Sequence, residues 1–139
     1  MAHWSGGIYN QCSFKEPFLD IVKLEGGEPA NFLDLGGGVK EEGVFEAFRI
    51  ITSDPQVKVI LVNIFGGIVN CEIIARGINR AYADLGISCP VVCRLEGTNV
   101  ESAQQILAES GNPVVNASNM GDAAVKAVAE LKDWFLILW

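Results

Sequence analysis

The sequence predicts an α/β fold in which helices cover both faces of a parallel sheet, and three observations support this prediction. Strand-like apolar runs alternate with helical patterns of roughly 10–15 residues, which is typical of parallel sheets. The longest apolar run, residues 57–65, is apolar at almost every position, as in a central strand buried on both faces. Glycine clusters, at residues 36–38 and 66–67, separate two of these strands from the helices that follow.

The first unit consists of a strand at residues 31–35, the three glycines, and a helix at residues 41–52. The segment "SDP" at residues 53–55 ends this helix. Apolar residues at spacings of three and four give the helix one apolar face, namely Val44, Phe45, Phe48 and Ile51.

The second unit begins with the strand at residues 57–65 and continues through "GGIVN" into a helix that reaches about residue 85. Asn70 suits the N-cap of this helix, and Glu72 suits its first turn. Gly86 suits its C-cap. The expected buried stripe of the helix comprises Ile73, Ile74, Gly77, Ile78, Ala81, Tyr82 and Leu85.

Two further units complete the pattern. The third has a strand at residues 89–95 and a helix that ends at Ser110. Thr98 and Glu101 have the spacing of a capping box at the start of that helix. The fourth has a strand at residues 113–118 and a helix at about residues 122–132.

The glycine junctions allow two interpretations. In parallel α/β sheets, ligands bind at the carboxyl ends of strands, beside helix N-termini that favour anions. Glycine lets backbone N–H groups approach such a ligand. Alternatively, the glycines only permit tight turns between strand and helix. For Gly66 and Gly67 the two interpretations have equal weight, whereas three glycines at 36–38 exceed what one turn needs.

Composition excludes several classes of partner and cofactor. The net charge is −7 and no basic cluster is present, which argues against nucleic acid and anionic membrane surfaces. No apolar stretch reaches the roughly 18 residues that span a membrane. The four cysteines form no C-x-x-C pair and His3 is the only histidine, so we expect no metal site. Buried free thiols in a reducing compartment are the simpler interpretation.

The two ends of the chain differ from its middle. Residues 1–14 lack the features of a transit peptide and of a signal peptide. The segment "DWFLILW" at residues 133–139 is apolar at six of its seven positions. It could pack as an additional strand or form an exposed apolar patch.

Three segments resemble a known family. They are "GGEPANFLDLGGGVKE" (26–41), "LVNIFGGIVNCEIIARGI" (61–78) and "PVVCRLEGTNVESA" (90–103). They are similar to the carboxy-terminal domain of succinyl-CoA synthetase (succinate–CoA ligase) β subunits. "DLGGGVKE" and "GGIVNC" are more similar to the eukaryotic GDP-forming subunit than to the bacterial one, which tends to have Arg where this chain has Asn70. The resemblance divides the chain into an unrelated arm at 1–19, the domain at 20–132 and the apolar tail at 133–139.

The resemblance implies a flavodoxin-like domain of an αβ enzyme of the citric-acid cycle, in the mitochondrial matrix. That enzyme interconverts succinyl-CoA, phosphate and nucleoside diphosphate with succinate, CoA and nucleoside triphosphate. A histidine of the α subunit carries the phosphoryl group. The implied partner is therefore an α subunit, and the implied ligands at the shared site are succinate, CoA and phosphate.

The family's substrate contacts correspond to Asn31, Gly67, Ile68 and Val69. Asn31 would offer its side-chain amide, and the loop would offer backbone N–H groups to a succinate carboxylate. Judged without the resemblance, Asn31 is a turn or cap residue.

The helix that faces the phosphohistidine would begin after Gly66, with Asn70 and Cys71 at its start. Arg94 could clamp a carboxylate, but pairing with Glu96 is the preferred interpretation. Asp34 is expected to order the glycine loop by accepting its N–H groups.

Full β subunits of this family also carry an ATP-grasp domain that binds nucleotide and Mg²⁺. Only about 25 residues precede "GGEPANF" here, so we expect a fragment that is inactive alone and binds no cofactor itself. GDP/GTP or ADP/ATP, with Mg²⁺, would belong to the full enzyme. The alternative is a non-catalytic module that docks on an α subunit. A response-regulator-like domain would need an aspartate cluster that Asp34 and Asp54 do not make.

Overall fold

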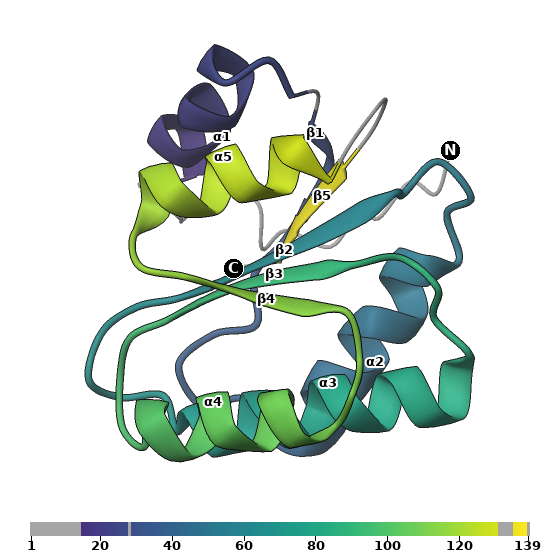
Figure 1. Cartoon of the computed structure of the whole chain (residues 1–139), viewed down its shortest axis with the longest axis vertical. Coiled ribbons are helices and arrows are strands. Elements are labelled where there is room, and N and C mark those ends of the chain that lie inside the picture. The colour runs from purple at the N-terminus through teal and green to yellow at the C-terminus, as the bar shows by residue number, and fades with distance from the viewer. Residues whose placement is uncertain (1–14, 28, 131–134, 139) are drawn as a thin grey trace.

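The computed structural model describes residues 15–27, 29–130 and 135–138 and has a sheet of five parallel strands, in the order β1-β5-β2-β3-β4. Figure 1 shows this sheet between two layers of helices. The strands are β1 (Pro29–Leu33), β2 (Val59–Ile64), β3 (Val91–Leu95), β4 (Val114–Ala117) and β5 (Phe135–Leu138). The helices are α1 (Lys15–Leu24), α2 (Glu41–Thr52), α3 (Cys71–Leu85), α4 (Val100–Glu109) and α5 (Met120–Ala129).

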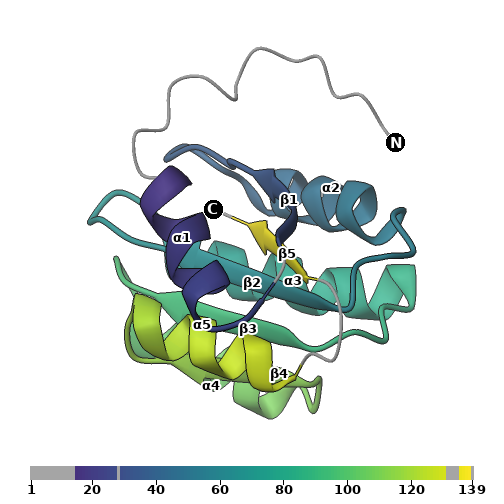
Figure 2. The same cartoon turned by 90° about the horizontal axis from the view of Figure 1, so that it is seen from above.

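Helices α2, α3 and α4 cover one face of the sheet, and α1 and α5 cover the other (Figures 1 and 2). Alternate residues of β2 serve the two cores, because side chains of a strand point to opposite faces in turn. Ile60 and Val62 pack in the core under α2, α3 and α4. Val59 and Leu61 pack with Val22 of α1 in the core under α1 and α5. Both faces are therefore covered, as predicted.

The predicted strand–helix units are confirmed, with small shifts at their ends. Helix α2 has the predicted bounds, Glu41–Thr52. Strand β2 ends at Ile64, so Phe65, which was predicted to end this strand, lies outside it and is 41% exposed. Helix α1 was not predicted at all, and it begins inside the segment predicted to be an unrelated arm. No described helix is long and apolar enough to cross a membrane.

Two predicted helix ends are confirmed and one predicted helix start is wrong. The Asn70 side chain caps α3 by accepting a hydrogen bond from the N–H of Glu72 at 3.0 Å, and Gly86 ends the helix with φ 63°. The N-cap of α4 is Asn99, with φ 59° and no side-chain cap, rather than Thr98. Thr98 instead bonds to the neighbouring loop, as described below.

The described part of the apolar tail, residues 135–138, forms a strand, which is one of the two alternatives predicted for the tail. Strand β5 lies inside the sheet, paired with β1 on one side and with β2 on the other. The flavodoxin-like order is 2-1-3-4-5. The order β1-β5-β2-β3-β4 has the same pattern, with β5 in the place of the first strand. The fold is thus flavodoxin-like, although its second position is filled by the last strand of the chain.

Candidate functional site

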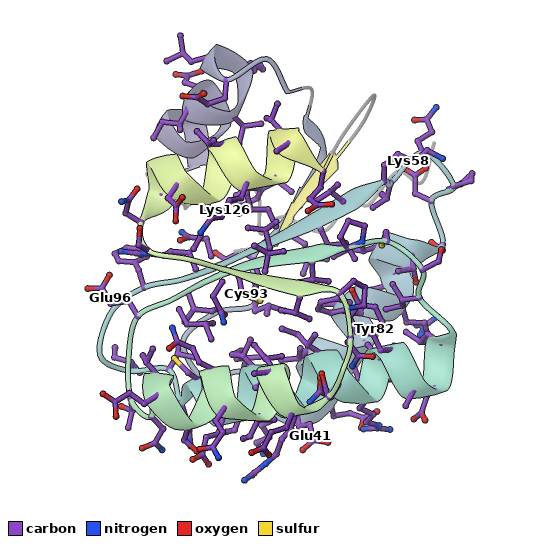
Figure 3. The ribbon with its side chains drawn as sticks, in the orientation of Figure 1. Glu41, Lys58, Tyr82, Cys93, Glu96 and Lys126 are labelled. Atoms are coloured by element: carbon purple, nitrogen blue, oxygen red, sulfur yellow. The ribbon has the colours of Figure 1, made fainter. Side chains whose placement is uncertain are left out.

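The glycine-rich loops lie together at the carboxyl edge of the sheet. Because all strands are parallel, the β1–α2 and β2–α3 loops leave the sheet from the same edge. Figure 3 shows the two ends of the sheet, with Lys58 before β2 at one end and Glu96 after β3 at the other. The sites predicted at residues 66–71 and at Asp34 belong to the Glu96 end.

The β2–α3 loop is exposed at its tip. Gly66 has φ 92°, a conformation that favours glycine, whereas Gly67 has no such φ and no atom within 4 Å of a Cβ added there. Ile68 is 85% exposed. No hydrogen bond between described residues uses the backbone N–H groups of Gly67, Ile68 or Val69. The fold therefore requires glycine at 66, while at 67 glycine leaves the backbone accessible.

A latch of three hydrogen bonds holds this loop against the β3–α4 loop. The N–H of Thr98 donates to the carbonyl of Val69 at 3.2 Å, and the N–H of Cys71 donates to the carbonyl of Thr98 at 3.0 Å. The hydroxyl of Thr98 donates to the carbonyl of Gly67 at 3.4 Å. A Cβ at Gly97 would come within 2.7 Å of the Val69 carbonyl oxygen, so only glycine permits this approach.

The N–H donors in the first turn of α3 already have partners within the chain. The N–H of Cys71 bonds to Thr98, and the N–H groups of Glu72 and Ile73 bond to the side chain and the carbonyl of Asn70. The Cys71 side chain is buried, and burial raises the pKa of its thiol. An anion at this end of α3 would therefore meet loop N–H groups and the helix dipole, not the thiol of Cys71.

The β1–α2 loop forms the other wall of the site. The N–H of Gly36 donates to Oδ1 of Asp34 at 2.8 Å, which confirms that Asp34 orders this loop. A Cβ at Gly37 would lie 3.7 Å from the Ile68 side chain, so the two glycine loops nearly touch. Between them is an open cavity of about 240 Å³, lined by residues 34–37, 63–65 and Val69.

The remaining predicted site residues have different outcomes. Asn31 lies in β1, paired with Leu136, but its side chain lies outside what the structure describes. Arg94 pairs with Glu96, as preferred from the sequence. Cys71 and Cys93 are free and buried, Cys89 is free and half-buried, and burial raises the pKa of all three thiols. The fourth cysteine, at position 12, lies outside the described residues.

One site residue was missed. Asn63 is 1% exposed, lies in β2, and lines the cavity between the two loops. Neither of its side-chain amide atoms has a hydrogen-bond partner among the described residues. The signal was present in "ILVNIF", since a polar residue within a doubly buried strand needs a partner.

The described residues do not fit a bound Mg²⁺ or nucleotide. No group of three or more His, Cys, Asp or Glu side chains within the described ranges could hold a metal ion. No Lys or Arg lines the cavity, although phosphate groups are usually bound by such side chains.

The chain is similar to known proteins over most of its length. The CoA-ligase family model matches residues 9–128. The chain is 62% identical over 112 residues to the β subunit of the mitochondrial GDP-forming succinate–CoA ligase of Columba livia, covering 81% of this chain and 29% of that protein. It is 58% identical over 124 residues to the equivalent subunit of Caenorhabditis elegans, covering 89% and 30%.

A bacterial relative gives the same result. The β subunit of the ADP-forming succinate–CoA ligase of Paracoccus denitrificans is 55% identical over 127 residues, which cover 91% of this chain and 32% of that protein. The chain thus spans 29–32% of the length of these curated relatives.

Proposed function

This chain belongs to the CoA-ligase family, and we propose that it forms the part of a succinate–CoA ligase β subunit that faces the α subunit. The complete enzyme would interconvert succinyl-CoA, phosphate and nucleoside diphosphate with succinate, CoA and nucleoside triphosphate. A histidine of the α subunit would carry the phosphoryl group to and from the shared site. This chain would supply the part of that site formed by its two glycine-rich loops.

The exposed β2–α3 loop is the observation that carries this proposal. Its three open N–H groups, at Gly67, Ile68 and Val69, are the type of donor that binds a carboxylate. The latch to Thr98 holds these donors in place before a ligand arrives. Such preorganisation favours binding, because the loop has little freedom left to lose.

The N-terminal end of α3 would stabilise the negatively charged phosphohistidine through the helix dipole. The first-turn donors are used within the chain, so Asn70 and Cys71 would act by fixing the helix end beside Gly66. Asn31 would add a side-chain amide to the succinate site, as the family motif implies.

We propose the location and the cofactors by similarity to the related proteins. The vertebrate and nematode relatives are mitochondrial proteins, so we place this chain in mitochondria, in the matrix by the resemblance. Nucleotide and Mg²⁺ would bind elsewhere in the full enzyme. The chain alone would be inactive.

A second candidate function is docking without catalysis. Ile68 and Phe65 are large apolar residues exposed on the same loop, at 85% and 41%. Apolar residues at an exposed tip are typical of a protein interface. This chain would then occupy the α subunit in place of a complete β subunit.

Association with an α subunit tests both functions. The full chain is mixed with the purified α subunit of a GDP-forming succinate–CoA ligase, and complex formation is measured by size-exclusion chromatography. We expect a stable complex without ligase activity. Activity in the mixture would contradict the inactivity that we propose. The absence of any complex would contradict both functions.

A loop variant tests the role of the open N–H groups. Gly67→Val adds bulk where the fold has open space, so it should weaken association or succinate binding while leaving the fold intact. The matched control is Ser88→Val, in the exposed loop between α3 and β3 at the opposite edge of the sheet. Equal behaviour of the two variants would show that the loop assignment is wrong.

A further inference from the structure

Strand β5 lies far, within the sheet, from the elements that precede it along the chain. It follows α5, which contacts β2, β3 and β4, and it comes after β4 in the order of strands along the chain. Strands that follow one another are usually neighbours in a sheet. Here β2 and β3 stand between β5 and β4. The position of β5 is therefore set by its two partners, β1 and β2, and not by its neighbours in the sequence.

The acceptor site for β5 consists of two strand edges, at residues 29–33 and 59–62. Strand β5 pairs with β2 in unbroken register, from Val59 with Phe135 to Val62 with Leu138. It pairs in parallel with β1 as well, with a shift of register between Pro29 and Asn31. Both edges come from the first half of the chain. Since this pairing runs through the backbone, a β5 from a second copy fills the acceptor site as well as the chain's own β5 does.

The composition of β5 makes it costly to leave this strand unpaired. Its four residues, "FLIL", are all apolar and carry no charge. An unpaired apolar strand, and two open strand edges, are each prone to pair with another chain. If two copies exchange β5, every hydrogen bond of the two ladders is kept. The exchange then costs only the entropy of association.

The connection from α5 to β5 is short. Four residues, 131–134, separate Glu130, the C-cap of α5, from Phe135. Fully extended, a chain of this length reaches about 17 Å. So short a connection limits the number of ways in which β5 can return to its own acceptor site, which lowers its effective concentration there. Short hinge connections favour exchange between copies for this reason.

We propose that two copies of this chain exchange β5, so that the β5 of each copy lies between β1 and β2 of the other. The dimer has two-fold symmetry, because each copy donates and receives the same strand. The partner at this surface is thus a second copy of the chain. The exchange is independent of the proposed function and requires no α subunit.

The first test identifies which copy supplies the strand. Val59 and Phe135 are register partners, so Val59→Cys is made in one full chain and Phe135→Cys in another that carries a different mass tag. The two chains are unfolded and refolded together, oxidised mildly, and analysed for covalent heterodimers by mass spectrometry. We expect heterodimers, because exchange brings the two introduced thiols together.

The matched control replaces Val59→Cys by Val114→Cys. Val114 begins β4, which does not pair with β5. The native cysteines contribute the same background to both pairs of chains. Equal yields of heterodimer from the two pairs would overturn the proposal.

The second test measures the oligomeric state of the unaltered chain by analytical ultracentrifugation, after refolding at several concentrations. We expect a dimer whose share increases with concentration. It should form and dissociate slowly, because β5 must leave one sheet before it enters another. A monomer at every concentration would overturn the proposal, and so would a dimer that gives no excess of heterodimer in the first test.

The third test lengthens the connection in the full chain. Gly-Ser-Gly-Ser is inserted after Glu130, with the same insertion after Ser88, in the exposed α3–β3 loop, as the control. The first insertion should raise the dissociation constant of the dimer on the order of tenfold or more, because β5 then reaches its own acceptor site more easily. The control should leave this constant unchanged. Equal constants for the two insertions would contradict the exchange. If a cysteine variant does not fold, the second and third tests decide.

Discussion

The two glycine-rich loops at the carboxyl edge of the sheet look alike in the sequence but are held very differently. The β2–α3 loop is joined to the β3–α4 loop through three hydrogen bonds with Thr98, and Asn70 caps the helix that follows. In the β1–α2 loop, the N–H of Gly36 bonds to the side chain of Asp34, and Lys40 at the start of α2 makes no side-chain cap.

The glycines of the two regions therefore have different structural roles. Gly97 permits a close approach of two backbones, which fixes the β2–α3 loop and its donors. In the β1–α2 loop, a Cβ added at Gly38 would meet no atom within 4 Å and one at Gly37 would meet only the Ile68 side chain at 3.7 Å, so no close approach requires these two glycines.

The largest expected effect comes from breaking the latch. Gly97→Ala would place a Cβ 2.7 Å from the Val69 carbonyl oxygen at a backbone φ of 154°, so the loops must separate. We expect a loss of about 2–3 kcal/mol in the free energy of unfolding, measured with urea. The control is Gly86→Ala, where φ is 63° but no atom lies within 4 Å of the added Cβ. A smaller loss for Gly97→Ala than for this control would show that the latch contributes little.

The next largest loss of stability is expected at Asn70, the N-cap of α3. Asn70→Ala removes the acceptor for the N–H of Glu72 and should cost about 1 kcal/mol. Urea unfolding gives the magnitude, and amide hydrogen exchange should rise at the start of α3. Asn70→Asp keeps the acceptor and should restore most of the stability. An unchanged rate of exchange in Asn70→Ala would contradict the capping role.

A smaller effect is expected in the β1–α2 loop. Asp34→Ala removes the acceptor for the N–H of Gly36, an exposed hydrogen bond, and should cost about 0.5–1 kcal/mol. Hydrogen exchange should rise in the β1–α2 loop and stay unchanged in the β2–α3 loop. Increased exchange in both loops would show that the two walls are coupled.

The smallest effect on stability is expected at Gly67. Gly67→Ala adds a methyl group in open space, and the backbone φ of Gly67 is not positive. The free energy of unfolding should therefore change by about 0.5 kcal/mol or less, measured with urea. Gly66→Ala, at φ 92°, should be clearly less stable. Equal losses at the two positions would remove the distinction between a structural and an accessible glycine.

The sequence predicted the repeated strand–helix units because periodicity is a local property. The apolar stripe of α2 and the cap at Asn70 follow from spacings of a few residues, and both are confirmed. The capping box at Thr98 was wrong for a non-local reason. Its hydroxyl and backbone bond to the β2–α3 loop, a contact that residue spacing does not reveal.

The site was only partly predictable because it, too, depends on contacts between residues far apart in the sequence. The family resemblance points to Gly67, Ile68 and Val69, and the structure adds that their N–H groups are open. Asn63 was overlooked because the strand was interpreted only as an almost wholly apolar, buried run. No local pattern indicates the position of β5 between β1 and β2 either.

The placement of β5 has a consequence for the order in which the chain can be built. In the described sheet, β1 pairs with β5 alone, and these are the first and last strands along the chain. During synthesis on a ribosome, β1 would remain without its partner until the elements between it and β5, from α2 to α5, had been made. Contacts of such long sequence separation slow folding. The exposed edges of β1 and β2 would meanwhile be open to other strands, so this chain should depend on chaperones more than a fold completed in order of synthesis.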